Sequence, residues 1–291
     1  MQSVSTDAAA IAKAINALVP DGVVRSTVAL LGSHGGAVRP IGSGTLLAVG
    51  EEFFVLSAAH VLRQAAEQEL TVGVARDSQI TACSRDWMLS DPDGARHDVH
   101  DVALYKLTSE EAARFTSSCF IRIGDVSFLA DLSNSYFVIC GFPALWTTAL
   151  APSDLTPVKS KLLLMGMDGF RGSSTGLDGF DSERHFLLRA DWSDIYDALT
   201  GKPARFRSRM GHPVDFPGAL QGISGCSVWR MGDLRVPPKF WGKPKLVGIE
   251  TAVYEKAGAI RATRWNSVTT MLYGAFPSTR PTLRMYEGMH G

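Results

Sequence analysis

The chain has 291 residues, which is enough for one large β domain or two smaller lobes. Hydrophobic residues make up 45% and charged residues 20% of the sequence, which is typical of a globular protein and excludes a disordered or fibrous one. Because Lys plus Arg equals Asp plus Glu at 29 each, no global charge favours a nucleic acid or an acidic membrane surface as partner.

Residues 1–20 are predicted to form a helix, which Ser5 or Thr6 can cap and Pro20 ends. The segment lacks the basic start and continuous apolar run of a secretory signal. No apolar run in the chain approaches the roughly 20 residues needed to span a bilayer. We therefore expect a cytoplasmic location, no membrane partner, and reduced, mostly buried thiols at the four scattered cysteines, Cys83, Cys119, Cys140 and Cys226.

Short β-branched or apolar runs, separated by turns, predict a mainly β protein with few helices. The clearest alternation is in "DVALYKL", where Val102 and Leu104 face one way and Tyr105 the other. A short helix is expected near the end, in "SVTTMLYGAF". The predicted strands lie within residues 23–32, 42–50, 51–60, 101–107, 135–143, 160–167, 184–192, 225–231, 244–254 and 258–265.

Two segments interrupt this pattern of strands. Residues 166–185 are rich in Gly, Ser and Asp and are predicted to form a long hairpin or loop. Their aspartates lack the spacing of a calcium loop, so turn chemistry explains them and no metal or other cofactor is predicted. The second segment, residues 201–220, could contact an acidic partner or peptide, although a solvated loop is the favoured interpretation. Its basic residues are Lys202, Arg205, Arg207 and Arg209.

Candidates for nucleophilic catalysis come from three separate places in the chain. A hydroxyl nucleophile needs a neutral base, a carboxylate that orients the base, and N–H donors for the oxyanion. In "QGISGCSVW" Ser224 lies in a glycine-rich turn, where the N–H groups of Gly222 and Ser224 can form an oxyanion hole. His60 follows an apolar strand and Asp101 opens the alternating one, so both can be held rigidly at the rim of a barrel.

Other residues of the same types compete for these roles. Asp98 is the main rival to Asp101, but only Asp101 directly precedes the alternating strand. His97 and His100 are rivals to His60, yet neither follows a Ser-Ala-Ala sequence. Taken singly, a histidine near a helix start or an aspartate before a strand is more often structural than catalytic.

Four motifs taken together resemble the chymotrypsin/trypsin-like serine protease superfamily: "TLLAVGEEFFVLSAAHVL", "HDVALYKL", "GISGCSVW" and "LVGIETAV". The resemblance covers residues 22–272 and includes the chain order His, Asp, Ser. It implies two packed six-stranded β-barrels, to which the residue pattern adds the N-terminal helix and the short C-terminal helix. The predicted parts are a helix at 1–20, a lobe at 21–128 with His60 and Asp101, a lobe at 129–275 with Ser224, and a tail at 276–291.

The resemblance also implies a role for each site residue. His60 would be the general base and later acid, Asp101 would hold its tautomer, and Ser224 would attack the scissile carbonyl. The N–H groups of Gly222 and Ser224 would receive the oxyanion. The substrate would be a protein or peptide, and the chain would be a serine endopeptidase.

Two neighbours of Ser224 depart from the animal digestive enzymes. Those enzymes carry an aspartate before the nucleophile, which pairs with a freed N-terminal amine; here the position holds Ile223, which cannot make that ion pair. The chain therefore looks more like a bacterial trypsin-like peptidase. Cys226 stands where the family often has glycine, and we interpret it as a small buried side chain and not a second nucleophile.

Substrate specificity is predicted from two residues of "GIETAV". By the resemblance, Thr251 lies near the triad carboxylate and Val253 lies on the wall of the primary pocket. Val253 would narrow a pocket that glycine leaves open. A small or medium apolar residue is therefore expected before the scissile bond.

Three alternatives to an active endopeptidase stay open. One is a protease-like binding module that has lost catalysis, and another is an esterase or other acyl hydrolase that uses the same triad. The third is a protease switched on by a regulatory protein partner. Its candidate contact surfaces are the N-terminal helix, the basic loop and the Gly/Asp-rich insertion at 166–185.

Overall fold

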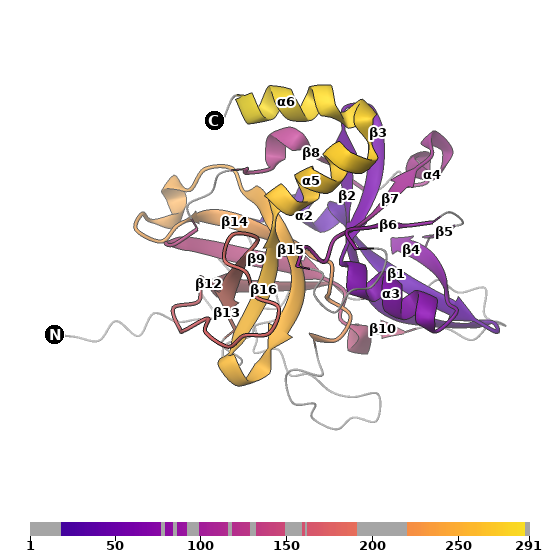
Figure 1. The fold of residues 1–291 in the computed structure, drawn as a ribbon, viewed down its shortest axis with the longest axis horizontal. Coiled ribbons are helices and arrows are strands. Elements are labelled where there is room, and N and C mark those ends of the chain that lie inside the picture. Colours follow the sequence, from indigo (N-terminus) through magenta and orange to yellow (C-terminus); the bar gives the residue numbers. More distant parts are fainter. Residues whose placement is uncertain are drawn as a thin grey trace.

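The computed structural model places two curled, mainly antiparallel sheets against each other, as Figure 1 shows. This confirms the mainly β, two-barrel fold that the sequence predicts. The helix expected at residues 1–20 lies almost entirely outside the described part of the chain. The described residues are 19–76, 79–83, 86–91, 99–115, 118–128, 132–148, 159–160, 162–190 and 220–288.

The first sheet has the order β5-β4-β1-β2-β3-β7-β6, with β8 added in parallel to β2. Four of its strands, β1, β2, β3 and β7, overlap the predicted ranges. The other four were not predicted: β4 and β5, and the two-residue strands β6 and β8. Its strands are β1 (Thr27–His34), β2 (Ala37–Val49), β3 (Glu52–Ser57), β4 (Thr71–Arg76), β5 (Gln79–Ala82), β6 (Met88–Leu89), β7 (Ala103–Leu107) and β8 (Ile121–Arg122).

Strand β7 shows why its sequence alternates. Val102 and Leu104 face the core between the two sheets, whereas Tyr105 and Leu107 face the core inside the first lobe. Lys106 points to the surface, where it pairs with a glutamate of β3. Both faces of this strand are therefore buried against different partners, as a strand between two cores requires.

The second sheet has the order β12-β9-β14-β15-β16-β13 and six strands within the described residues. An isolated bridge between Gly169 and Leu188 joins its two ends, so the sheet closes on itself. Two short strands, β10 (Thr147–Thr148) and β11 (Lys159–Ser160), pair separately. The sheet contains β9 (Ser135–Gly141), β12 (Leu163–Asp168), β13 (His185–Arg189), β14 (Ser227–Asp233), β15 (Lys245–Tyr254) and β16 (Ala259–Arg264).

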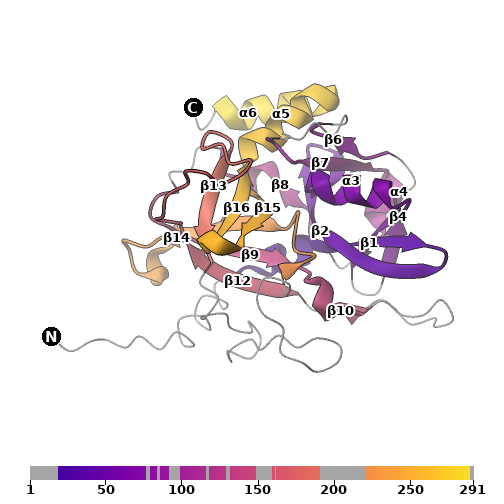
Figure 2. The ribbon, with the colours of Figure 1, turned by 60° about the horizontal axis from the view of Figure 1, so that its bottom comes forward.

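An apolar core lies between the sheets and holds the lobes together. Side chains from β2, β3 and β7 meet side chains from β9, β14 and β15 there. Two C-terminal helices cover one end of this core, and Figure 2 shows them lying across both lobes. The residues of the core that they contribute are Trp265, Val268, Leu272 and Leu283.

Helices are few and short. The predicted helix near the end is present, but a second one occupies the segment expected as a tail, because Leu283 and Tyr286 form a narrow apolar stripe that packs on the interlobe core. The α-helices are α2 (Asp21–Ser26), α3 (Ala59–Glu67), α4 (Ser109–Ala113), α5 (Trp265–Ala275) and α6 (Arg280–Gly288). The 3-10 turns are η1 (Ile123–Asp125), η2 (Ala144–Trp146), η4 (Pro238–Phe240), η5 (Glu255–Ala257) and η6 (Pro277–Thr279).

Candidate active site

His60 lies in the first turn of α3, directly after β3. The residues before it, Ala58 and Ala59, are completely buried, so the start of the helix is fixed in the first lobe's core. The imidazole is 40% exposed. The sequence thus places a histidine with a rigid main chain and a reachable ring at the edge of the first lobe.

Asp101 holds His60 through both oxygens of its carboxylate. Oδ1 accepts a hydrogen bond from the His60 main-chain N–H, and Oδ2 lies 2.8 Å from the ring Nδ1. The aspartate has a φ of 48°, a left-handed conformation that Asp tolerates better than most residues. Because Nδ1 donates to the carboxylate, Nε2 is the nitrogen left to act as a base.

His60 and Asp101 each stabilise the charged form of the other. Burial alone would lower the pKa of His60, but its hydrogen bond to Asp101 and the negative charges of Asp101 and Glu250 outweigh burial and raise that pKa above 6.5. Burial alone would raise the pKa of Asp101, but the hydrogen bonds and charge of His60, with the charge of Arg261, lower it below 3.8. Asp101 therefore stays ionised at neutral pH.

Ser224 lies in a tight loop that precedes β14 and contains two left-handed glycines, Gly222 and Gly225. A Cβ on Gly222 would lie 2.6 Å from the main-chain nitrogen of Ala144, and one on Gly225 would lie 2.2 Å from the Ser57 hydroxyl. Neither position accepts another residue without displacing its neighbours. The glycines of the motif are explained by this close approach.

The first lobe holds the Ser224 loop through one serine of β2. The main-chain N–H of Ser43 donates to the Ser224 carbonyl at 2.9 Å, and its hydroxyl donates to the Gly222 carbonyl at 2.8 Å. The same hydroxyl accepts a hydrogen bond from the N–H of Phe142. The loop is thus part of the second lobe in sequence and is fixed by both lobes in space.

The predicted oxyanion donors are oriented differently from their neighbours. Within the described residues, the N–H groups of Gly222 and Ser224 donate no hydrogen bond, whereas those of Ile223, Gly225 and Cys226 each donate to a carbonyl. Gly222 and Ser224 also line one pocket. Two N–H groups beside the serine hydroxyl are therefore available to a bound oxygen.

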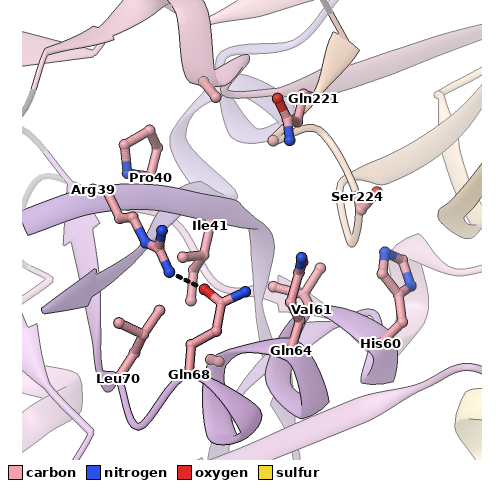
Figure 3. Close-up of a pocket in the computed structure, with 13 residues that line it drawn as sticks. Arg39, Pro40, Ile41, His60, Val61, Gln64, Gln68, Leu70, Gln221 and Ser224 are labelled. Atoms are coloured by element: carbon pink, nitrogen blue, oxygen red, sulfur yellow. Dashed lines mark hydrogen bonds between the residues drawn. The ribbon is translucent and has the colours of Figure 1, made fainter. Parts of the chain in front are cut away.

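Figure 3 shows this pocket, with Ser224 and His60 at one end. Its volume is about 310 Å³, and it lies between the start of β2, helix α3 and the Ser224 loop. No hydrogen bond joins Ser224 to His60. Catalytic hydrogen bonds are often long before substrate binds, so this geometry is compatible with a nucleophile and its base.

The two residues predicted to govern specificity lie apart from this pocket. Thr251 is buried, and its hydroxyl accepts a hydrogen bond from Nε of Arg261, which in turn reaches Asp101. Thr251 is thus close to the triad carboxylate through a third residue. Val253 is half-buried and packs on the core of the second lobe.

Sequence reasoning missed two charged residues at the site, Glu250 and Arg261. Glu250 is completely buried in β15, and neither carboxylate oxygen accepts a hydrogen bond within the described residues. Burial raises its pKa to about 7, although the charges of His60 and Arg261 and the nearby Ser224 hydroxyl oppose that rise. Charged residues inside apolar strands, in "GIETAV" and "GAIRATRW", were the signal that could have revealed them.

The other residues that the sequence analysis considered lie away from the pocket or outside the described residues. His100 lies 3.0 Å through Nδ1 from the Ser267 hydroxyl of α5, and not at the pocket. Cys226 is completely buried, and burial raises its pKa well above 9. Ile223 packs in the core of the second lobe. His97, Asp98 and the basic residues of 202–209 lie outside the described residues.

The Gly/Asp-rich segment forms turns between β12 and β13, as the sequence predicts. These two strands lie at opposite ends of the sheet path and are joined at the antiparallel Gly169–Leu188 bridge, so the segment is a long loop between them and not a tight hairpin turn. Among the described residues, no cluster of His, Cys, Asp or Glu has the makeup of a metal site. No helix in the described part of the chain is both long and apolar enough to cross a membrane.

No protein-family model matches the sequence, and no curated protein does. Solved structures do match. A thermostable serine protease, AL20, from an extremophilic microorganism aligns with 85% of this chain and 95% of its own, at 11% identity and a TM-score of 0.51. A Glu endopeptidase aligns with 86% and 90%, at 13% identity and a TM-score of 0.47. With the two sheets and their order already described, the first of these likenesses shows that the chain has the two-barrel fold of the trypsin-like serine proteases.

Proposed function

We propose that the protein is a serine endopeptidase that uses Ser224, His60 and Asp101. The observation that carries this proposal is the double hydrogen bond between His60 and Asp101, made beside the pocket that Ser224 shares with His60. A carboxylate on Nδ1 leaves Nε2 free to accept a proton, which is the arrangement a hydroxyl nucleophile needs. The protease fold supports the same class of reaction.

In the first half of the reaction, Ser224 Oγ forms a bond to the carbonyl carbon of a peptide while its proton passes to His60 Nε2. The carbonyl oxygen becomes negative and is stabilised by the N–H groups of Gly222 and Ser224. The carbon–nitrogen bond then breaks, and the leaving amine takes the proton from His60. An acyl group remains on Ser224.

The second half repeats these steps with water. His60 removes a proton from water, the hydroxide adds to the acyl carbon, and the ester bond to Ser224 breaks as His60 returns the proton to Oγ. Asp101 keeps its charge throughout and stabilises the imidazolium that forms twice. The chemistry needs a peptide or protein as substrate and one water molecule for each bond cleaved.

Reaction with a fluorophosphonate probe tests the proposal, because such a probe bonds only to an activated hydroxyl. Wild-type protein should react, and Ser224→Ala and His60→Ala should not. Ser227→Ala is the matched control, since Ser227 belongs to the same motif but accepts a hydrogen bond from Trp229 in the core. It should react like the wild type.

Other results would favour the alternatives. Folded wild-type protein that does not react would support a binding module. Reaction that appears only after a protein partner is added would support a partner-activated protease. Labelled protein that cleaves esters but no member of a peptide library would support an acyl hydrolase.

A further inference from the structure

Arg261 of β16 is a buried cation that connects three parts of the molecule. The residue is only 8% exposed. Its Nε donates to the Thr251 hydroxyl at 3.1 Å, and its Nη1 donates to the Gly179 carbonyl at 2.9 Å. Its Nη2 reaches Asp101 Oδ2 at 3.4 Å. One side chain therefore joins β15, the loop between β12 and β13, and the carboxylate beside His60.

The contact with Asp101 uses the oxygen that also faces the imidazole. Oδ2 lies 2.8 Å from His60 Nδ1 and 3.4 Å from Arg261 Nη2. A guanidinium keeps its charge at every pH that the protein meets, so this oxygen always interacts with a fixed cation. Moving Arg261 would change both the position of the carboxylate and the charge that the histidine experiences.

The contact with Gly179 ties Arg261 to the loop at residues 169–184. Gly179 has a φ of 65°, and a Cβ there would lie 2.9 Å from Arg261 Nη1. Next to it, the carbonyl of Asp178 accepts a hydrogen bond from the Tyr254 hydroxyl at 2.6 Å. The loop therefore lies on the guanidinium with its main chain, and the missing side chain of Gly179 makes that approach possible.

We propose that Arg261 is a positioning residue that makes the geometry of the Asp101 carboxylate depend on the loop at residues 169–184. This inference rests on the proposed function, in which Asp101 orients the base. The loop touches neither His60 nor Ser224 in the described contacts, and Arg261 links it to Asp101. A change in the loop at Gly179 is transmitted to the base without altering any residue of the triad.

The electrostatics give this role a measurable signature. Burial and the charge of Arg261 lower the pKa of His60, whereas Asp101 and Glu250 raise it. Removing the guanidinium should therefore raise the pKa of His60. The charge of Arg261 also acts to lower the pKa of Asp101, Glu250, His185 and Tyr254.

The first experiment compares the full-length wild type with Arg261→Gln. The titration of His60 is followed by NMR with labelled histidine, and its signal is assigned by its absence in His60→Ala. The pKa of His60 should rise in Arg261→Gln. With a peptide substrate, kcat should fall more than KM changes, since the base is misplaced and the substrate pocket is not.

The second experiment leaves the charge in place and disturbs only the loop. Gly179→Ala puts a methyl group against Nη1 and should move Arg261 away from Asp101. Gly176→Ala is the matched control, because Gly176 has a φ of 81° in the same loop and a Cβ there would meet nothing within 4 Å. Both variants carry backbone strain, but only Gly179→Ala should shift the His60 titration, in the direction of Arg261→Gln.

Each result decides the proposal. It is overturned if folded Arg261→Gln titrates like the wild type at His60, or if the two glycine variants shift His60 equally. If Arg261→Gln does not fold, the glycine pair decides alone. The titration needs no turnover, so a wild type that fails to react with the fluorophosphonate probe refutes the proposed protease and leaves this test intact.

Discussion

His60 and Asp101 are joined twice, because the main-chain N–H and the ring Nδ1 of the histidine each contact a different oxygen of the same carboxylate at 2.8 Å. The first contact fixes the start of helix α3, and the second fixes the ring. The carboxylate thus positions both the main chain and the side chain of the proposed base. This relationship allows the contribution of the carboxylate to be separated from that of the helix.

Replacing Asp101 by Asn should abolish most of the activity without unfolding the protein. An amide oxygen can still accept the main-chain hydrogen bond, but an amide group facing Nδ1 stabilises the wrong tautomer and no imidazolium. Loss of this charge lowers kcat by about 10⁴-fold in triads of this type. Steady-state kinetics on a peptide substrate measures the effect, with circular dichroism as the check on folding. A variant within tenfold of the wild type would rule out the assigned role.

The rate of the wild-type protein should rise with pH through a midpoint above 6.5. The base must be neutral, and the pKa of His60 is raised because the hydrogen bond and charge of Asp101 overcome burial. The rate of fluorophosphonate labelling across a pH series gives the midpoint. The same midpoint should be lower in Asp101→Asn, since the raising influence is gone. A wild-type midpoint below 6.5 would contradict the interpretation.

Glu250 should make the protein less stable as pH rises. Its pKa is about 7 in the folded chain against an ordinary value of 4.5, so the folded state binds this proton more tightly than the unfolded state. The associated stability is complete below the ordinary value and is lost as pH rises toward 7. The shift corresponds to about 3 kcal/mol.

Glu250→Gln removes the titrating carboxyl group and tests this pH dependence of stability. Urea unfolding at about pH 4 and about pH 8 should show the free energy of unfolding of the wild type falling by about 3 kcal/mol relative to the variant. Parallel pH dependences in the two proteins would show that Glu250 does not titrate in this range. The variant keeps the volume of the side chain, so packing differences stay small.

Gly225→Ala should destabilise the protein far more than a glycine substitution elsewhere. A Cβ on Gly225 would lie 2.4 Å from the Ser43 carbonyl oxygen, and the φ of 87° is itself unfavourable. Together these should cost about 3 kcal/mol. Gly35→Ala, with a φ of 55° and open space around its Cβ, should cost only about 1 kcal/mol. Equal midpoints in urea unfolding would contradict the argument.

Val253 lies outside the pocket that Ser224 lines, and we propose that it belongs to a separate pocket wall that limits the residue before the scissile bond to small or medium apolar side chains. A peptide library should show this preference in the wild type. Val253→Gly should extend it to larger side chains. A wild-type cleavage profile dominated by Arg, Lys or Phe before the scissile bond would contradict this proposal.

Many of the strands, and the three motifs that contain His60, Asp101 and Ser224, could be predicted from the sequence because each depends on a local rule. The alternation of β7 follows from two cores on opposite faces, and the glycines of the Ser224 loop follow from steric limits. Four strands of the first sheet, β4, β5, β6 and β8, were not predicted from the sequence. Pairs as short as β6 and β8 depend on their neighbours in space more than on their own residues.

The charged residues next to the proposed triad could be identified only from the three-dimensional structure. Glu250 and Arg261 lie in strands that are otherwise predicted to be buried. The sequence therefore shows that two charged residues are unusual there, but it does not show which residues they contact. Their significance depends on Asp101, which lies 160 residues from Arg261 along the chain. Helix α6 was missed for a related reason, since two residues, Leu283 and Tyr286, provide most of its contact with the interlobe core.

Ser43 has a consequence for inhibition. Through its N–H and hydroxyl, the first lobe holds the loop that carries Ser224, the proposed nucleophile of the second lobe. A compound that bound between the lobes at Ser43 would break these two hydrogen bonds and distort the loop without contacting His60, Asp101 or Ser224. Such an inhibitor would not resemble a substrate, and no amount of substrate would displace it by competition.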